Sequence, residues 1–154
     1  LQHEDCKLGE GIYQVRITAG AESCAADEED AACAVTSETG RICKGEVVVV
    51  SAAVMGTGDD VLGEILMKGF VYALSQQDVL PETVLLYNGG AFLSTEGAET
   101  TADLQAMAAE GVEILTCGTC MNHYGLTEKL AVGGVTNMYD ITAKMTQASR
   151  LIRP

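Results

Sequence analysis

The chain has 154 residues, 47% of them hydrophobic, with no Trp and two Pro; this suits one folded domain with an appendage and excludes a fibrous or disordered protein. The formal net charge of −13, from 22 acidic and 9 basic side chains, argues against nucleic acid and anionic membranes as partners, because phosphate binding requires clustered Lys and Arg. The longest apolar runs are far shorter than the roughly 20 residues of a membrane span, and no signal peptide opens the sequence. We therefore expect a cytoplasmic protein that binds neither nucleic acid nor membranes.

The start of the chain differs in composition from the rest. Residues 11–20 alternate apolar and polar side chains, as a half-buried strand does, and residues 1–6 are a candidate partner strand. A lone hairpin is marginally stable in water, so we expect residues 1–20 to be the end of another domain. Residues 21–45 are small, acidic and without apolar periodicity, which predicts a flexible linker before a folded domain at residues 46–154.

Six cysteines are present, and only Cys117 and Cys120 are close in the sequence. Cys24, Cys33 and Cys43 lie in the predicted linker at spacings far from the close pairs of zinc sites. A disulfide framework belongs to small secreted chains with poor cores, and this chain is long enough for a sizeable core. We therefore expect no metal and no cofactor, and we place the chemistry at the close pair.

From residue 46 onward, strand and helix patterns alternate. The first strand is a continuous β-branched run, as expected of a strand covered on both faces in a parallel sheet. In the helix after it, five apolar side chains form one stripe, and Thr57 and Asp60 have the spacing of a capping box. Thr100 and Asn137 are predicted helix starts, and Gly111 is a predicted helix end. Strands are predicted at residues 46–53, 82–90, 112–117, 133–137 and 150–153, helices at 58–77, 100–111, 118–130 and 138–149, and the stripe consists of Leu62, Ile65, Leu66, Phe70 and Leu74. This alternation specifies an α/β fold with a mainly parallel five-stranded sheet and helices on both faces.

The loops that leave the carboxyl ends of parallel strands meet at one edge of the sheet, where ligands usually bind. Residues 51–60, 87–97 and 116–120 leave predicted strands in this way, so we expect them to be neighbours. Gly56 and Gly58 do not complete a dinucleotide or P-loop motif, because a third Gly and a Gly-Lys-Ser/Thr sequence are absent. A turn followed by a capped helix is the favoured interpretation.

Several residues near this edge are candidate substrate contacts. Met55 is expected in the core or in a pocket wall. Asn88 and its two following glycines most simply provide backbone freedom, and the alternative is a set of backbone N–H groups for an anionic sulfur or oxyanion. The candidate substrate-binding residues are Met55, Gly56, Asn88, Gly89, Gly90, Gly118, Thr119 and His123.

Cys117 stands where a predicted strand ends and a helix begins. Unsatisfied N–H groups and the helix dipole favour the thiolate at such a place, and the thiolate is the nucleophile. Cys117 is therefore a candidate to attack a sulfur donor and hold a persulfide, and Cys120, one turn on, is placed to resolve it or to accept the sulfur. His123 would lower the pKa of Cys120 if it is protonated; for His123 and Tyr124 the favoured interpretation is a helix surface or a subunit contact.

Other roles for the pair fit less well. Zinc requires four ligands where one close pair is present, and a disulfide staple would close a very short loop and add little stability. Thioredoxin-like chemistry follows an early strand and depends on a nearby Pro, whereas this pair comes late and Pro81 is the only internal Pro. A dithiol-disulfide oxidoreductase and a non-catalytic oligomeric binding module stay open as alternatives to a sulfur carrier.

Four segments of the sequence carry a resemblance to a known family: MGTGDDVLGEILMKGFVYAL, LLYNGGA, EGVEILTCGTCMNHYGLTEKLAVGGVTNMYDI and the final LIRP. Residues 46–154 closely resemble the C-terminal domain of YedF-type proteins, which are sulfurtransferase-like proteins of selenium metabolism. That domain belongs to the DsrE/DsrF-like superfamily. The loop at residues 51–58 departs from the more polar form that is usual in the family.

The resemblance implies a three-layer α/β sandwich that assembles as a homo-oligomer. It assigns the role of sulfur acceptor to Cys117, which stands eight residues before Gly125, and makes Cys120 an addition of the subfamily. It also implies that residues 1–20 end a TusA-like domain whose Cys-Pro motif precedes this sequence. The implied function is the relay of sulfur or selenium by a sulfurtransferase-like protein, and the implied partners are other sulfur-relay proteins or the TusA-like domain itself.

Overall fold

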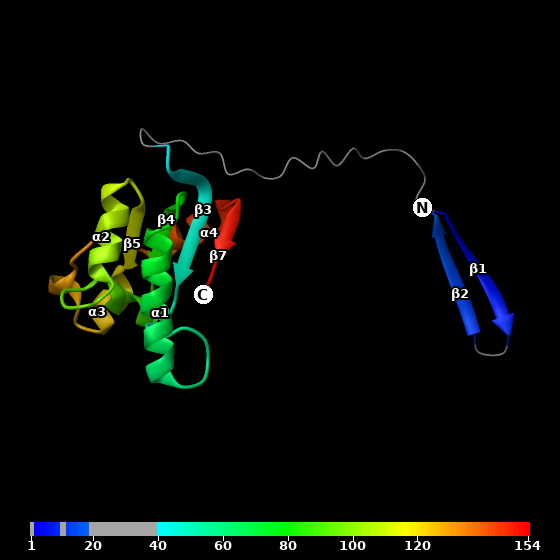
Figure 1. The fold of residues 1–154 in the computed structure, drawn as a ribbon, viewed down its shortest axis with the longest axis horizontal. Helices are drawn as coiled ribbons and strands as arrows, with labels where there is room; N and C mark the ends of the chain where they lie inside the picture. The colour runs from blue at the N-terminus through cyan, green and yellow to red at the C-terminus, as the bar shows by residue number, and fades with distance from the viewer. Residues whose placement is uncertain (1, 10–11, 19–39) are drawn as a thin grey trace. The chain divides into compact units, whose positions relative to one another are not determined.

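A computed structural model describes residues 2–9, 12–18 and 40–154 of the chain, which divides into two compact units at residues 1–32 and 33–154. In the first unit, β1 (Gln2–Gly9) and β2 (Ile12–Thr18) pair as an antiparallel hairpin, so the predicted partner strand is present (Figure 1). Most of the predicted linker, with Cys24 and Cys33, lies outside the described residues. The prediction for its last part was wrong, because β3 begins at Ile42 and buries Cys43.

Five strands form the sheet of the second unit, in the order β6-β5-β4-β3-β7, and every pairing is parallel. The prediction of a mainly parallel five-stranded sheet is confirmed. β3 and β4 are buried along most of their length, which explains why their second halves, residues 47–50 and 84–86, are continuously apolar rather than alternating. The strands are β3 (Ile42–Val50), β4 (Leu80–Leu86), β5 (Glu113–Cys117), β6 (Gly134–Thr136) and β7 (Arg150–Ile152).

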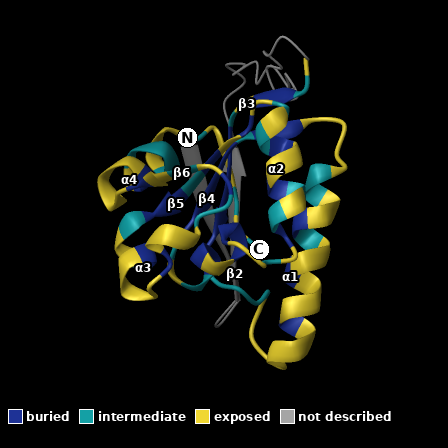
Figure 2. Cartoon of the chain, turned by 90° about the vertical axis from the view of Figure 1, so that its left-hand side faces the viewer, coloured by how far each residue is buried: buried dark blue, intermediate teal, exposed yellow. Residues whose placement is uncertain are grey.

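Helices cover both faces of this sheet, as Figure 2 shows, with α1 and α2 on one side and α4 on the other. Alternate strand residues point to opposite faces. Val48 and Val50 accordingly pack with Met67 of α1, whereas Val47 and Val49 pack with Ile141 of α4. The three-layer α/β architecture is therefore confirmed. The α-helices are α1 (Asp60–Ser75), α2 (Thr101–Ala109), α3 (Gly118–His123) and α4 (Met138–Gln147), and the 3-10 helices are η1 (Asn88–Ser94) and η2 (Thr127–Lys129).

The buried face of α1 differs from the stripe that the sequence suggested. Gly63, Met67 and Val71 are the residues buried against the sheet. Of the predicted stripe, Phe70 and Leu74 are partly buried and pack against the core. Ile65 and Leu66 are 62% and 46% exposed, and Leu62 is exposed as well. Gly63 lies against residue 54, and a Cβ on Gly63 would lie 2.9 Å from the Val54 side chain. The absence of a side chain at Gly63 therefore allows this close approach. α1 therefore carries a second apolar face that this domain does not cover.

The helix caps were predicted with mixed success. Asn137 caps α4 by accepting a hydrogen bond from the Asp140 N–H (3.0 Å), as predicted, and Gly111 follows α2 with φ +103°. At α1, Asp59 rather than Thr57 is the cap, and its carboxylate accepts from the Leu62 N–H (2.8 Å). At α2, the Thr100 hydroxyl donates instead to the Leu93 carbonyl (2.7 Å). The helix expected at residues 118–130 is shorter than predicted and ends at His123.

No helix of the described part of the chain is long and apolar enough to cross a bilayer.

Candidate functional site

The carboxyl ends of β3, β4 and β5 bring three loops together. Val50 pairs with Leu86, and Leu86 pairs with Thr116, so the three strands end side by side. A Cβ on Gly90 would overlap the carbonyl oxygen of Val50, and a Cβ on Gly89 would lie 3.1 Å from the Ala53 nitrogen. The loop after β4 thus lies directly on the loop after β3, which requires glycine at both positions. The sequence-based prediction that these loops are neighbours is confirmed.

Cys117 is the last residue of β5 and the residue before α3. It is a free cysteine and is 1% exposed, packed among Val47, Val49, Leu85 and Ile141. α3 has only six residues, so its dipole is smaller than that of the longer helix that the sequence suggested. Cys117 therefore lies inside the protein, under the loops at the edge of the sheet.

Cys120 is also a free cysteine, and it is more exposed than Cys117. Its sulfur accepts a hydrogen bond from the backbone N–H of Asn88, with an N to Sγ distance of 3.0 Å. Burial is the largest influence on the pKa of the Cys120 thiol and raises it. The Asn88 N–H lowers this pKa, and the interaction with Cys117 raises it. The net shift of the pKa is upward. The Cys120 thiol is therefore harder to ionise in the folded protein than an ordinary cysteine.

A side-chain contact holds the Asn88 backbone in place. Asn88 has φ +49° and is the only non-glycine among the described residues with positive φ. The Tyr124 hydroxyl donates to Asn88 Oδ1 at 2.9 Å. The Tyr124 ring lies between those of Phe92 and His123, at centroid distances of 4.8 and 4.9 Å. His123 is thus exposed and packs edge-on against Tyr124, in agreement with the helix-surface interpretation.

The remaining predicted contacts lie around this pair in different ways. Gly118 allows α3 to approach β6, because a Cβ there would lie 2.9 Å from the Val135 side chain. Thr119 is exposed on α3. Met55 packs against the core and donates its N–H to the Gly63 carbonyl (3.0 Å), and Gly56 (φ +75°) forms the turn before α1. Met55 and Gly56 thus have the structural roles that the sequence allowed as their simpler interpretation.

The sequence did not single out two aromatic side chains and one arginine near the thiols. Tyr87 packs against the cluster that contains Cys117, and the Arg153 guanidinium donates to its hydroxyl (3.4 Å). For Tyr124 the sequence suggested only a surface role. All three are far from the cysteines in the sequence or lack a recognisable spacing, so no pattern could have selected them.

Within the described residues, no group of three His, Cys, Asp or Glu side chains could hold a metal ion.

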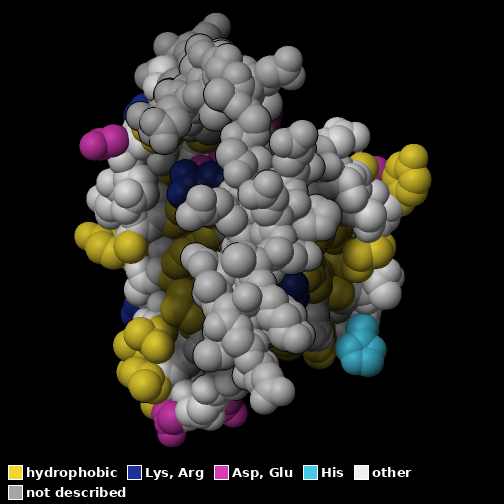
Figure 3. Space-filling model, turned by 90° about the vertical axis from the view of Figure 1, so that its right-hand side faces the viewer, with side chains coloured by type: hydrophobic (Ala, Val, Ile, Leu, Met, Phe, Trp, Pro, Cys, Tyr) yellow, Lys and Arg dark blue, Asp and Glu magenta, His cyan; other side chains and the backbone are white. Residues whose placement is uncertain are grey.

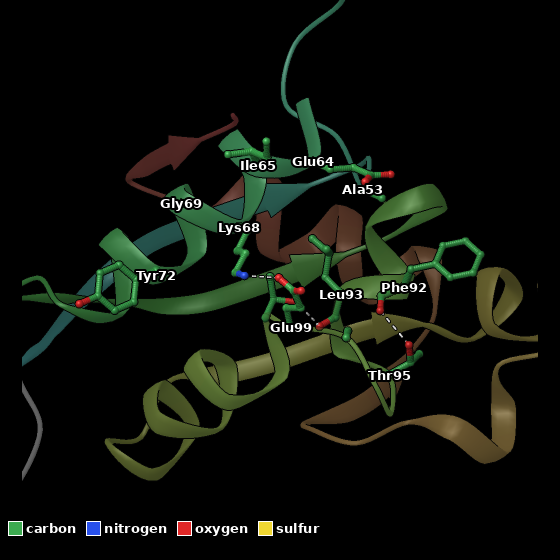
Figure 4. A pocket seen from close by; sticks show the side chains of 12 residues that line it. Ala53, Glu64, Ile65, Lys68, Gly69, Tyr72, Phe92, Leu93, Thr95 and Glu99 are labelled. Atoms are coloured by element: carbon green, nitrogen blue, oxygen red, sulfur yellow. Dashed lines mark hydrogen bonds and ion pairs between the residues drawn. The ribbon is translucent and has the colours of Figure 1, made fainter. Parts of the chain in front are cut away.

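A cavity of about 830 Å³ opens between α1 and the segment from η1 to the start of α2 (Figure 4). Ile65, Tyr72, Phe92 and Leu93 provide most of its apolar wall, and Lys68 and Glu99 form an ion pair at its side. Phe92 belongs to this wall and also stacks on Tyr124. Neither thiol lines this cavity, which is linked to the residues around Cys120 only through the contact between Phe92 and Tyr124.

A model of the DsrE/DsrF-like family matches residues 66–154, which contain the carboxyl ends of β4 and β5 and both thiols. The chain belongs to the DsrE/DsrF-like family. The matched part of this DsrE/DsrF-like chain runs from the middle of α1 to the end of β7. The resemblance stated for residues 46–154 is thereby confirmed at the level of the family.

Solved structures share this DsrE/DsrF-like fold. MTH1491 from Methanobacterium thermoautotrophicum, a protein of unknown function, aligns with a TM-score of 0.54 and 18% identity over 74% of this chain and 99% of its own. BT1422 from Bacteroides thetaiotaomicron, also of unknown function, aligns with a TM-score of 0.50 and 10% identity over 71% and 95%. At such identities the likeness shows the fold alone. No curated protein matches the chain.

Proposed function

We propose that this chain is a sulfur-relay protein that holds sulfur, or selenium, as a persulfide or its selenium analogue on Cys117. The observation that supports this most directly is the free thiol pair at the end of β5, with a backbone N–H aimed at one of its sulfurs. Membership of the DsrE/DsrF-like family, together with the resemblance to YedF-type proteins, adds to it. The activity that follows is that of a sulfurtransferase-like carrier.

The proposed chemistry is an exchange of a sulfur atom between thiolates. A thiolate of the pair attacks the outer sulfur of a donor persulfide, a new S–S bond forms, and the S–S bond of the donor breaks. The donor leaves as a thiolate with the electron pair, so no net oxidation occurs. Because Cys117 is 1% exposed, a persulfide held there would be shielded from water and from other thiols.

The experiment is persulfide loading followed by mass spectrometry. The protein is incubated with a small persulfide donor, the donor is removed, and the adducts are mapped and followed over time. We expect the wild type to keep the added sulfur on Cys117 and the Cys117→Ser variant to lose it quickly. Tyr139→Phe, at a residue that is 83% exposed, serves as the control and should retain sulfur as the wild type does. A Cys117→Ser protein that retains as much sulfur as the wild type would contradict the proposal.

A dithiol-disulfide oxidoreductase is the second candidate, and the packing of the two free cysteines in one cluster favours it. The pair would then form a reversible Cys117–Cys120 bond with a reduction potential between about −270 and −120 mV, the range of catalytic pairs. Equilibration with glutathione buffers and trapping of the free thiols measures this potential. A non-catalytic binding module would show neither a disulfide in this range nor sulfur loading.

We also propose that the protein assembles as a homo-oligomer through the exposed apolar face of α1. Val61, Leu62, Ile65 and Leu66 lie on consecutive turns and are 46–67% exposed, and contiguous exposed apolar surface of this kind marks interaction sites. Hydrophobic side chains also reach the surface in the view of Figure 3. Sedimentation of wild type and Ile65→Glu tests the interface, and association that survives the charge would argue against it. Other sulfur-relay proteins, or a TusA-like domain that ends at residues 1–20, are the proposed exchange partners.

A further inference from the structure

The two thiols are not equally reachable. Cys117 is 1% exposed, whereas Cys120 is partly exposed and lies beside the loop after β4. A donor that approaches from solvent meets the sulfur of Cys120 first. The same sulfur receives the backbone N–H of Asn88, which Tyr124 holds through the Asn88 side chain.

We propose that sulfur is taken up at Cys120 and then passed inward to Cys117, and that Tyr124 is a positioning residue that keeps the Asn88 N–H on the Cys120 sulfur. This inference rests on the proposed sulfur relay, and it adds the order of the two thiols and the residues that support the first one. The contacts that carry it join three separate elements: η1, α3 and the turn after α3.

The Asn88 backbone is the strained part of this arrangement. A φ of +49° is uncommon for a residue other than glycine, although Asn tolerates it better than most. At this residue the backbone N–H donates to the Cys120 sulfur. The Tyr124 hydroxyl bonds to the Asn88 carboxamide oxygen, and Phe92 packs on the Tyr124 ring, so both ends of the contact are held.

An N–H donor matters most when the sulfur carries charge. Hydrogen bonds to ionised groups are roughly twice as strong as neutral ones, so the Asn88 N–H stabilises the Cys120 thiolate more than it stabilises the thiol. Burial opposes ionisation of Cys120, and this N–H acts against that penalty. Loss of the hydroxyl of Tyr124 should therefore make Cys120 harder to ionise.

The two steps conserve atoms and electrons. In the first, the Cys120 thiolate attacks the outer sulfur of a persulfide donor, forms Cys120–S–SH, and releases the donor as a thiolate. In the second, the Cys117 thiolate attacks the outer sulfur of Cys120–S–SH, forms Cys117–S–SH, and leaves Cys120 as a thiolate. Each step makes one S–S bond and breaks one, and the proton travels with the outer sulfur.

Alkylation tests the first thiol without any sulfur donor. Wild-type protein is treated briefly with iodoacetamide, and the labelled cysteines are identified by mass spectrometry. We expect Cys120 to be labelled at least several-fold faster than Cys117. In a Cys117→Ser background, the rate at Cys120 is then measured from pH 6 to pH 10. Tyr124→Phe should shift this profile to higher pH and lower the rate at pH 7 a few-fold, the size expected for the loss of one hydrogen bond.

Two further variants separate positioning from general damage. Asn88→Gly keeps the backbone N–H and tolerates the positive φ, but removes the oxygen that Tyr124 contacts. It should shift the profile as Tyr124→Phe does, and the double variant should add nothing more. Tyr139→Phe, at a residue that is 83% exposed, is the matched control and should leave the profile unchanged.

The inference is overturned if Cys117 is labelled first, or if Tyr124→Phe and Asn88→Gly both leave the pH profile of Cys120 where it was. If Tyr124→Phe unfolds the domain, as circular dichroism would reveal, the Asn88→Gly profile decides alone. A failure of the proposed sulfur relay itself would give a different result: Cys120 would be alkylated before Cys117, but the protein would take up no sulfur from a persulfide donor. Donor uptake that is slowed at least tenfold by Cys120→Ser supports the order of the two thiols, and uptake that is unaffected contradicts it.

Discussion

Cys117 and Cys120 are three positions apart in the sequence and belong to the same packed cluster, but the immediate surroundings of the two thiols differ. The buried region around Cys117 consists of alternate residues of β3 and β4 with Ile141 of α4. The open region around Cys120 consists of loop and turn residues, Asn88 and Tyr124, joined by two hydrogen bonds. Packing holds the first thiol, whereas two hydrogen bonds add to the packing of the second, so a substitution in the polar contacts can disturb Cys120 and leave the packing of Cys117 as it is.

The largest effect is expected from Ile141→Ala, which acts first on the packing around Cys117. Ile141 is 1% exposed, and removing most of such a side chain from a core destabilises by roughly 2–5 kcal/mol, because a cavity remains. The opening should also increase iodoacetamide labelling of Cys117 relative to Cys120. Urea unfolding and mass spectrometry measure both effects. Val79→Ala, at an exposed residue, is the control, and an unchanged labelling ratio in Ile141→Ala would mean that packing does not shield Cys117.

Gly90→Ala is expected to disturb the junction of the two regions. Its added Cβ would overlap the Val50 carbonyl oxygen, so the loop that carries Asn88 must move. Overpacking of this kind destabilises by roughly 1–3 kcal/mol, and we expect the pH profile of Cys120 alkylation to shift with it. Gly69→Ala is the matched control, because its Cβ would meet open space on α1 and alanine favours a helix. Equal stability of the two variants would show that the loop has room to adjust.

The pH dependence of the free energy of unfolding tests the surroundings of Cys120. The pKa of Cys120 is raised in the folded protein, first by burial. The stability from this thiol is therefore fully present below the unfolded-state pKa of about 8.5 and is lost as the pH rises through the folded-state value. Urea titrations between pH 7 and pH 10 should show a steeper decline for wild type than for Cys120→Ser. Parallel declines would contradict the raised pKa.

The smallest effect is expected far from both thiols, at Lys44. The hydrogen bond from Lys44 (2.8 Å) lowers the pKa of Glu82, and the Gly45 N–H lowers it further. The resulting stability is present above the unfolded-state pKa of about 4.3 and is lost as the pH falls through the lowered folded-state value. Because the pair is largely exposed, Lys44→Met should cost at most about 1 kcal/mol at pH 7. The labelling ratio of the two thiols should not change, and Lys129→Met is the control for loss of a surface charge.

Much of the fold could be predicted from local patterns. The continuous apolar runs at β3 and β4, the Asn137 cap of α4 and the glycine after α2 all follow from the chemistry of neighbouring residues. The buried face of α1 could not, because its sequence is apolar on two faces. Close packing of Gly63 on residue 54 selects the face that turns inward, and that contact is a tertiary one.

The candidate site divides in the same way. A Cys-x-x-Cys spacing after a strand is a local feature, and it is enough to predict that both thiols lie at the edge of the sheet. The support of Cys120 by Tyr124 and Asn88 joins residues 36 positions apart, and the contact of Arg153 with Tyr87 joins residues 66 positions apart. Tyrosine, asparagine and arginine carry no periodic signal at such separations.

By itself, the sequence determined the order of strands and helices, the parallel sheet, the place of the cysteine pair and its resemblance to the DsrE/DsrF-like family. These follow from periodicity, caps and spacing, which act within a few residues of one another. Only the tertiary structure decided that Cys117 is buried and Cys120 is reachable. Burial of Cys117 depends on Ile141 and on strands far away in the chain, and the polar support of Cys120 depends on a backbone conformation at Asn88 that Tyr124 holds.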